Sequence, residues 1–516
     1  MTTLPPRPSL DHLRRQARNL LRAAQAGDTG SEARIRVVSQ RLTLAAAQLA
    51  VAREYGFASW ARLKTEVEAR TTDLARLAEE FCEASIRDWT GRAARMLAAT
   101  PELAGYSFAT AVILGDASRV RREIGRDPGL ATRPDARSGW TPLHAVCGSR
   151  WHRLDPARAD GMLAVARLLL DAGADLQARA GQWTPLRCSV AGAANPAIAR
   201  LLLERGAVPA DHDLYLAGFG DDDHQCLRLL LEHAPDVPAI ARQALAAPVS
   251  TNDLDGVRLL LEAGADPRRY VNDDGTPSAA VYAAVSAGCS AELVELLLAH
   301  GAKPGAPGPD GRSPHAVATA QGRADLAALL RRYGADDDAT SIDRFLSACQ
   351  RADLADVRQQ VARDPGLPGR LTAEQQGEAI QHAAEAGHTA AVRLMLDLGF
   401  PIESRGGDGN TALHTAAYAG SAGTVRLLID RGADVEARDM HWDSTPLEWA
   451  AVGSGERPAS NPRPDWVATA AALIEAGASI EGIRPSADDP KPPSPAVAEF
   501  LRARGVPDVD QAQNTT

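Results

Sequence analysis

Cysteine pairs, long apolar runs and aromatic residues are all scarce in this chain, and each scarcity excludes a class of protein. The six cysteines are scattered and form no CxxC pair, which argues against a disulfide framework and against a cysteine metal site. No stretch approaches about 18 consecutive apolar residues, and the first residues lack the apolar segment of a secretion signal. Aromatic residues make up only 4% of the chain, which favours small, closely spaced helices over a large sheet core. We therefore expect a protein of the reducing cytoplasm without membrane contact.

Motifs of the common enzyme classes are also missing. The sequence contains no GxSxG, HExxH or GxxxxGKS/T motif and no glycine-rich loop between a strand and a helix. Acidic residues with one histidine and one cysteine run from Asp221 to Cys226, but neighbouring residues of a turn cannot all face one ion. We therefore predict no catalytic residue, no metal and no cofactor, and we interpret the chain as non-enzymatic.

Positive charge is in deficit and unevenly distributed. The chain has 56 Lys and Arg against 66 Asp and Glu, a net charge of −10. Residues 1–70 hold 12 basic and 6 acidic residues, which leaves 44 and 60 in the remainder. Because affinity for phosphates comes from positive charge, this acidic body argues against a nucleic-acid partner. Only three of the basic residues are lysine, a coding bias that indicates a bacterial genome.

The chain does contain a repeat with a period of about 33 residues. The glycines at 173 and 206, at 301 and 334, and at 399 and 432 are each 33 residues apart. In each copy, apolar residues at i, i+3 and i+4 predict a helix with one apolar stripe, and the glycine predicts the end of that helix. The clearest copies are ARLLLDAGAD at 166, ARLLLERGAV at 199, VRLLLEAGAD at 257, VELLLAHGAK at 294, VRLMLDLGFP at 392 and VRLLIDRGAD at 425.

A second motif opens the copies. Thr141-Pro142-Leu143-His144 and Thr411-Ala412-Leu413-His414 predict a first helix, because the Thr hydroxyl can cap it and Pro suits its first position. With this opening, two helices and a closing Gly-Ala-Asp, the sequence resembles the ankyrin repeat family. The resemblance implies an all-α solenoid of about twelve helix pairs with short β-hairpin or loop fingers and a concave groove lined by first helices. It also implies that His144 and His414 hold the turns of their own repeats.

The resemblance divides the chain into three parts. Residues 1–70 predict a helical cap with one helix from Ser9 to about Ala26, one from about Leu42 to Arg53 and a short third helix. The string at 49–64 resembles a leader that precedes ankyrin arrays in many bacterial proteins. Residues 71–484 predict the solenoid, with degenerate copies at 71–135. Residues 485–516 predict a proline-rich tail with one short helix near Ala496–Arg504.

A longer periodicity indicates two halves of the solenoid, 105–340 and 341–484. The string Arg-Asp-Pro-Gly-Leu occurs at 126–130 and again at 363–367. Each half also has a repeat with about eleven extra residues between its two helices, at 148–160 and at 453–465. An old duplication explains both features, and convergence of loop lengths is the alternative.

Aromatic residues at positions that the ankyrin pattern leaves on the surface are the candidate binding residues. Exposed tryptophans on a finger are unfavourable unless a partner or a neighbouring finger covers them. Long loops on a rigid scaffold also often carry function, so the first insertion contributes two candidates. The predicted partner-binding residues are Trp140, Trp183, Asn410 and Trp442 on or near the fingers, Tyr418 and Trp449 on first helices, and Trp151 and His152 in the insertion.

We therefore expect a monomeric interaction protein that binds a partner protein or peptide along its groove and fingers. One alternative is an enzyme or small-ligand receptor with a pocket under an insertion, using His152 and Asp155 or Glu448, Trp449 and Glu456. The other alternative is a structural spacer with one binding site in each half. An enclosed pocket favours the former, and two independent binding activities favour the latter.

Overall fold

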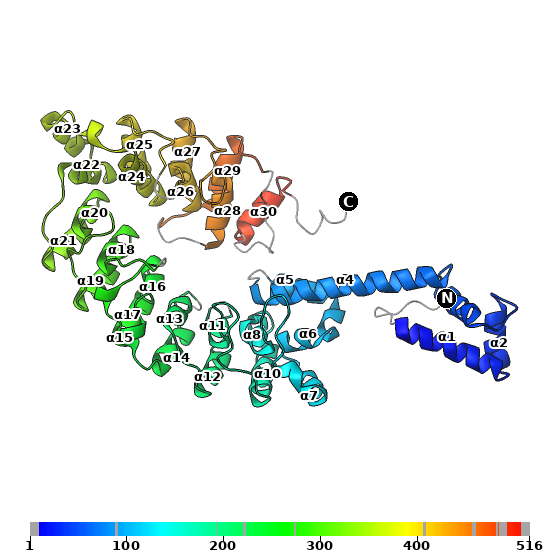
Figure 1. Ribbon diagram of the computed structural model, residues 1–516. Coiled ribbons are helices and arrows are strands. Elements are labelled where there is room, and N and C mark those ends of the chain that lie inside the picture. Colours follow the sequence, from blue (N-terminus) through cyan, green and yellow to red (C-terminus); the bar gives the residue numbers. More distant parts are fainter. Residues whose placement is uncertain are drawn as a thin grey trace. The chain divides into compact units, whose positions relative to one another are not determined.

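The computed structural model describes residues 10–87, 91–191, 193–219, 223–272, 275–405, 409–456, 461–480, 483 and 493–506. Figure 1 shows that the chain is built from helices joined by turns. Within the described ranges, extended segments pair only at two isolated bridges, Ala180 with Trp183 and Val271 with Pro277. The all-α prediction is therefore confirmed. The chain forms two compact units, Met1–Cys188 and Ser189–Thr516.

The first unit begins with four helices: α1 Leu10–Gln25, α2 Thr29–Arg36, α3 Leu44–Glu54 and α4 Trp60–Arg87. Apolar residues between Leu13 and Val67 form a core of their own. The first two predicted helices match α1 and α3, but the prediction of only three helices is wrong. Asp28 caps the additional helix by accepting the Ser31 N–H at 2.8 Å. Helix α4 is long because residues 60–87 contain no Gly or Pro that would end it.

The rest of the first unit consists of shorter helices that stack on one another. Helix α6 packs on α7 and α8, and α8 packs on α10. Gly173 ends α10 in the left-handed region at φ +90°, as its spacing predicted. The α-helices are α5 Arg92–Ala99, α6 Phe108–Ile113, α7 Ala117–Arg126, α8 Pro142–Gly148, α9 Trp151–Leu154, α10 Ala159–Asp171 and α11 Pro185–Val190. The 3-10 helices are η1 Pro101–Gly105, η2 Pro128–Ala131 and η3 Pro156–Arg158.

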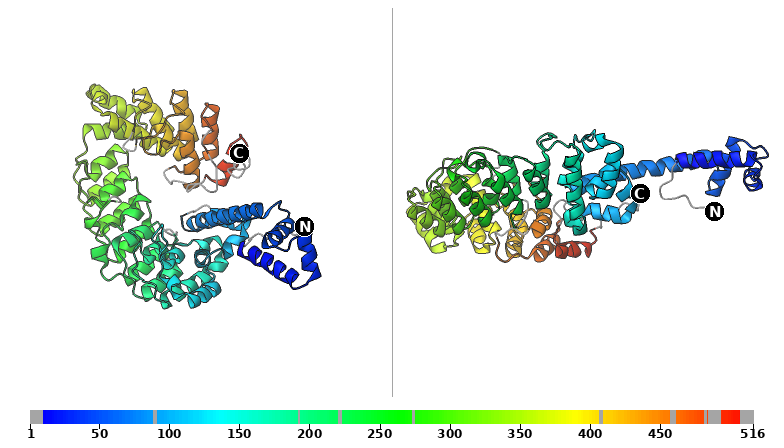
Figure 2. Two further views of the ribbon diagram at one scale, coloured as in Figure 1. Left: turned by 45° about the vertical axis from the view of Figure 1, so that its right-hand side comes forward. Right: turned by 90° about the horizontal axis from the view of Figure 1, so that it is seen from below.

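The second unit repeats a helix pair along the chain, as Figure 2 shows from two directions. First helices pack on first helices, for example α24 on α26 and α26 on α28, and second helices pack on second helices, α25 on α27 and α27 on α29. The helices up to the middle of the unit are α12 Pro196–Glu204, α13 Asp211–Ala217, α14 Gln225–His233, α15 Val237–Ile240, α16 Ala246–Ser250, α17 Leu254–Glu262, η4 Pro267–Arg269, α18 Ala280–Ser286, α19 Ala291–Ala299, α20 Pro314–Ala320 and α21 Ala324–Arg332. The later helices are α22 Ser341–Gln350, α23 Leu354–Arg363, η5 Pro368–Arg370, α24 Ala373–Glu385, α25 Thr389–Asp397, α26 Ala412–Tyr418, α27 Ala422–Asp430, α28 Pro446–Glu456, α29 Trp466–Glu475 and α30 Pro495–Arg502.

One position of the first helix supplies the core of successive repeats. Phe345, Ile380, Leu413 and Leu447 come from α22, α24, α26 and α28, and each is almost completely buried in one apolar cluster. Each such side chain contributes about 1.5–3 kcal/mol when it is removed from water. The predicted stripe residues of the second helices, such as Val425, join the same cluster. The repeat pattern of the sequence is therefore a pattern of core positions.

The two motif histidines hold the turns, as predicted. His144 Nδ1 lies 2.8 Å from the Thr141 hydroxyl and its Nε2 lies 3.3 Å from the Trp183 carbonyl oxygen. His414 repeats the arrangement, with 2.8 Å to the Thr411 hydroxyl and 3.1 Å to the carbonyl oxygen of Ser444. Burial lowers the pKa of both imidazoles, so they are neutral near pH 7. Each therefore ties its own helix to the finger of the next repeat.

The duplicated Arg-Asp-Pro-Gly-Leu string lies at the end of a helix at both positions, but residues 128–130 lie in η2 whereas residues 365–367 form a turn before η5. It ends α7 and α23 respectively, and in each copy the aspartate forms an ion pair with an arginine six residues later, Asp127 with Arg133 and Asp364 with Arg370. The predicted tail helix matches α30, whereas most of residues 485–516 lies outside the described ranges.

Candidate functional site

Three predicted residues meet in one aromatic cluster in the second unit, which we define as Tyr418, Trp442 and Trp449. Trp449 lies in the middle, with ring centroids 5.6 Å from Trp442 and 5.8 Å from Tyr418. Both contacts are edge-to-face, the geometry that aromatic quadrupoles favour. His414 adds a further edge contact at 5.6 Å. The finger before α28 and two consecutive first helices thus build one surface.

Asp439 orients the finger that carries Trp442, and the sequence analysis did not single it out. Its carboxylate accepts the backbone N–H groups of His441 at 2.8 Å, Trp442 at 2.6 Å and Ser444 at 3.0 Å. It also accepts the Trp449 indole N–H at 2.9 Å. Burial by itself would raise the pKa of Asp439, but these hydrogen bonds, led by that of Trp442, lower it. An Asp at the start of a polar turn was the available signal, since such residues often bond to the turn's own backbone.

The outer edge of the aromatic cluster faces solvent. The Trp442 side chain is 60% exposed and the neighbouring Met440 is 78% exposed. Met440 lies over Gly409 of the preceding finger, where a Cβ atom would come within 2.5 Å of the Met440 Cβ. Asn410, predicted on a free finger surface, is instead buried. Its backbone carbonyl oxygen accepts a hydrogen bond from the Gln381 side-chain amide at 2.5 Å. The exposed apolar surface is therefore formed by Met440 and Trp442.

Trp140 and Trp183 pack against each other in the first unit. Their ring centroids are 6.4 Å apart, and Trp140 also lies 5.8 Å from the His144 ring. Trp140 covers Gly148, where an added Cβ atom would come within 3.0 Å of the indole. Both tryptophans are half-buried. The packing of one finger on the next, considered as an alternative to partner contact for these two tryptophans, is present. Part of each ring is still accessible.

The insertion at 148–160 is folded and anchored. It contains α9 and η3, and its Trp151 is only 3% exposed. The Trp151 indole donates to the Ser85 hydroxyl at 2.9 Å, and the Ser149 hydroxyl donates to the Ile113 carbonyl at 2.8 Å. Trp151 is therefore a packing residue between the insertion and α4. Its neighbour His152 is half-buried in the same segment.

The insertion at 453–465 is anchored in a similar manner. Helix α28 extends through its first residues to Glu456, and residues 457–460 lie outside the described ranges. Asn461 donates to the Ala419 carbonyl at 2.9 Å, and the Asp465 N–H donates to the Gly420 carbonyl at 2.8 Å. Both insertions thus bond to the end of the first helix of the preceding repeat, α6 in one case and α26 in the other.

The carboxylates considered for a small-ligand site are engaged with their own neighbours. Asp155 pairs with Arg158 at 3.0 Å. Glu448 accepts the Thr445 N–H at 2.6 Å, and Glu456 accepts the Tyr418 hydroxyl at 2.7 Å. Burial, followed by the hydrogen bond and charge of Glu456, raises the pKa of Tyr418. These groups do not converge on one point.

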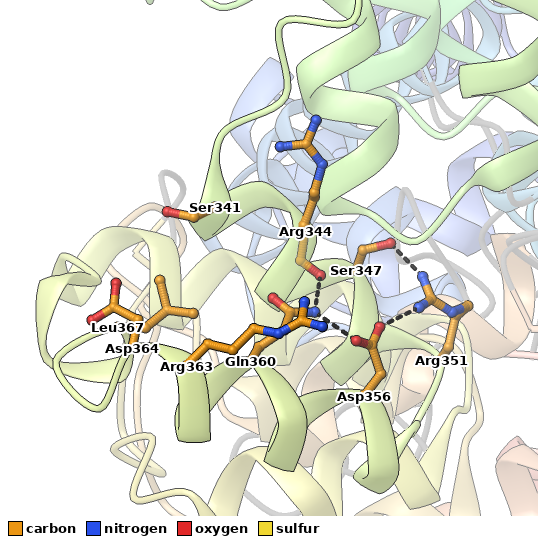
Figure 3. A pocket seen from close by; sticks show the side chains of 9 residues that line it. All are labelled: Ser341, Arg344, Ser347, Arg351, Asp356, Gln360, Arg363, Asp364 and Leu367. Atoms are coloured by element: carbon orange, nitrogen blue, oxygen red, sulfur yellow. Dashed lines mark hydrogen bonds and ion pairs between the residues drawn. The ribbon is translucent and has the colours of Figure 1, made fainter.

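A hollow of about 490 Å³ lies between α22 and α23 and not at an insertion (Figure 3). It is open to solvent, and its polar side chains bond to one another. Arg351 pairs with Asp356 at 3.1 Å, and Gln360 donates to the same carboxylate at 3.0 Å. Its lining residues are Ser341, Arg344, Ser347, Arg351, Asp356, Gln360, Arg363, Asp364 and Leu367.

Metal and thiol chemistry find no support among the described residues. No group of three or more His, Cys, Asp or Glu side chains there is placed to hold a metal ion. The cluster at 221–226 lies partly outside the described ranges. Burial raises the pKa of Cys289 to about 11 and that of Cys349 to about 12, so these thiols are not activated nucleophiles. None of the described helices is long and apolar enough to span a membrane.

The Asp439 carboxylate provides a first test. The Asp439→Asn variant is expected to lose about 1–3 kcal/mol of unfolding free energy at pH 7, because an amide cannot accept all the N–H groups that the carboxylate accepts. The pKa of Asp439 in the folded chain is below its ordinary value of 3.8. Its contribution is therefore complete above pH 4 and is lost as the pH falls through the lowered pKa.

Urea denaturation of both proteins between pH 7 and pH 3 measures this effect. The difference between wild type and Asp439→Asn should shrink at the acidic end. Asp443→Asn, an exposed aspartate of the same finger, is the control and should stay within about 0.5 kcal/mol of wild type. Equal stability of the Asp439 and Asp443 variants at pH 7 would show that Asp439 does not hold the finger.

Two segments of the chain match family models. Residues 346–439 match a model of three ankyrin repeats in a row, and residues 138–180 match a model of a single ankyrin repeat. The ankyrin repeat domain of human ASB11 is a similar solved structure, with 19% sequence identity and a TM-score of 0.22. That match covers 46% of this chain and 99% of the domain. No curated protein matches the chain.

Proposed function

We propose that this chain, whose residues 138–180 and 346–439 are ankyrin repeats, is a non-enzymatic interaction protein that binds a partner protein or peptide through its fingers and first helices. Ankyrin repeats generally act as protein-interaction modules. The observation that carries the proposal is the exposed pair Met440 and Trp442 beside Trp449 and Tyr418. Binding hot spots typically contain a tryptophan near the centre of the interface, with less critical residues around it.

The rigidity of this surface supports the proposal. Four hydrogen bonds to Asp439 hold the finger, and the Trp449 ring is wedged between Trp442 and two residues of α26. A surface that is ordered before binding loses less conformational entropy when a partner arrives. We also propose the predicted division into a cap at 1–70, a solenoid at 71–484 and a tail at 485–516. We also propose that the protein is a monomer and that it acts in a bacterial cytoplasm.

A spacer with two binding halves is a second candidate. It is favoured by the two insertions, which are both anchored to backbone carbonyl groups at the end of a first helix, and by the partly accessible Trp140 and Trp183. A small-ligand receptor has less support, because its candidate carboxylates pair with their own neighbours.

Trp442→Ala tests the main proposal by quantitative affinity capture from extracts of the source cells. A partner retained by the wild-type chain is expected to bind the variant about 30-fold more weakly, the effect of losing an interface tryptophan. Phe219→Ala is the control, since Phe219 is also an exposed aromatic residue of the second unit. The Trp140→Ala/Trp183→Ala double variant tests the first unit in the same assay. If neither Trp442→Ala nor the Trp140→Ala/Trp183→Ala double variant weakens retention of the partner, the aromatic surfaces are not the binding sites.

A further inference from the structure

The first helices around the aromatic cluster carry charge of only one sign. Helices α24, α26 and α28 contain Glu374, Glu378, Glu385, Glu448 and Glu456, and they contain no Lys or Arg. The outer helices between them carry the basic residues, for example Arg393 on α25 and Arg426 on α27. Figure 1 shows α24, α26 and α28 as consecutive neighbours in one row. The charged side chains of this row of first helices are therefore all glutamates.

The glutamates of α24 share one face of the helix and continue to the aromatic cluster. Glu374, Glu378 and Glu385 are spaced by four and seven residues, which places them along one side. Glu374 and Glu378 are exposed, and no described basic side chain forms an ion pair with either of them. At the other end of the row, the charges of Glu456 and Glu385 both act on the Tyr418 hydroxyl. The acidic face and the aromatic cluster therefore meet at Tyr418.

A nearby cation does not neutralise this face. Arg312 acts on Glu378, but its guanidinium pairs with the buried Asp343 carboxylate at 2.5 Å, and Asp310 adds a further negative charge beside it. The Oδ1 atom of Asn410 is buried without a hydrogen-bond partner among the described residues. Asn410 connects α24, through Gln381, with the finger that Met440 covers. The fingers beside this surface also carry Arg405 and Arg438, but both guanidinium groups donate to backbone carbonyls of these fingers, and Arg438 also pairs with Asp443. The charged side chains on the first helices themselves are glutamates.

We propose that the partner of this surface is a basic polypeptide segment, whose Arg or Lys side chains pair with the glutamates while one apolar side chain packs on Met440 and Trp442. This inference rests on the proposed function and states the chemistry of the partner. Three first helices about 10 Å apart cover about 20 Å, which about six extended residues can span. An arginine can also stack on the exposed face of Trp442. The charge complementarity favours this occupant over an acidic or neutral peptide.

Titration calorimetry with the full chain and two 12-residue synthetic peptides tests the inference. The basic probe alternates Arg and Ala around one central Leu, and the second probe has Glu in place of every Arg. We expect the basic probe to bind, its affinity to fall as NaCl rises from 0.05 to 0.5 M, and the acidic probe not to bind. Equal binding of both probes overturns the inference.

Charge-matched variants locate the site. Glu374→Gln/Glu378→Gln/Glu385→Gln is expected to bind the basic probe about tenfold more weakly. The control, Glu232→Gln/Glu262→Gln/Glu292→Gln, removes three exposed glutamates from the outer helices α14, α17 and α19 and should bind like wild type. Similar losses in both triple variants would show attraction to the overall negative charge and overturn the inference. Replacing the central Leu by Ser in the probe should weaken binding to wild type and leave binding to Trp442→Ala unchanged.

The affinity-capture and calorimetry results together distinguish a failure of this inference from a failure of the proposed function. If the basic probe does not bind but Trp442→Ala still loses a captured protein, the surface binds a partner of another chemistry and only this inference is wrong. If Trp442→Ala also retains every captured protein, the proposed binding surface itself is wrong. Equally tight binding of spermine, a small polycation, would show that charge alone is recognised and would overturn the polypeptide assignment.

Discussion

Replacing Gly453 with alanine is expected to destabilise the second unit by about 3 kcal/mol or more. Gly453 lies inside α28, where an added Cβ atom would come within 2.0 Å of the Tyr418 carbonyl oxygen and 2.8 Å of its carbon. The obstacle is backbone and cannot rotate away. The same carbonyl oxygen accepts the Trp466 indole N–H at 2.8 Å, so shifting α26 to make room would also break that hydrogen bond.

Urea denaturation followed by hydrogen exchange of α26 and α28 measures this effect. Gly423→Ala is the matched control, because Gly423 also lies in a helix and its added Cβ atom meets only the Thr389 hydroxyl, at 3.5 Å. The control should be neutral or more stable by up to about 1 kcal/mol, since alanine favours helix over glycine. If both variants unfold at the wild-type urea concentration, the close packing of α28 on Tyr418 is disproved.

Replacing Trp151 with alanine is expected to destabilise the first unit by about 3–5 kcal/mol. The indole is almost completely buried, its ring lies 5.9 Å from that of Phe81, and its N–H donates to Ser85. Both partners belong to α4, and Arg150 also bonds to the Ile86 carbonyl at 3.0 Å. The substitution leaves a cavity and removes the hydrogen bond between the insertion and Ser85, so it should loosen the insertion and the end of α4 together.

Hydrogen exchange, read peptide by peptide, tests whether this loss is local to the first unit. Protection should fall in residues 76–87 and 148–160 and stay constant in α24 to α29. Trp151→Phe keeps a buried ring and loses only the indole hydrogen bond, so about 1 kcal/mol is expected for it. An alanine variant with wild-type protection in both segments would mean that the insertion is a free loop, as its length alone had indicated.

Local sequence patterns predicted most of the fold because each repeat depends on near neighbours. The apolar stripe around Val425 and the cap at Thr141 act over three or four residues, and both took the expected structure. The same reasoning missed α2 and the length of α4. The end of the first helix near Ala26 was predicted, but the capacity of Asp28 to start a new helix was not recognised. Beyond Trp60 the lack of breakers was the available signal for a long helix.

The candidate site was predicted in composition but not in arrangement. Trp442, Trp449 and Tyr418 were identified separately, from their places in the repeat, and the structure brings them together. Asn410 was placed on the surface by the same rule, yet it is buried. Exposure differs because it depends on the neighbouring repeat, here on the finger that places Met440 over Gly409.

The sequence by itself determined that this protein is a helical repeat array, because a period of 33 residues and a recurring apolar stripe leave few other folds open. Only the tertiary structure decided which tryptophans pack and which face solvent, and that α24 and α28, which carry the glutamates, both pack on α26, whose Tyr418 joins the cluster of Trp442. The physical reason is distance along the chain. Caps and stripes act within a few residues, whereas the burial of Trp151 and the alignment of α24 with α28 join residues more than sixty positions apart.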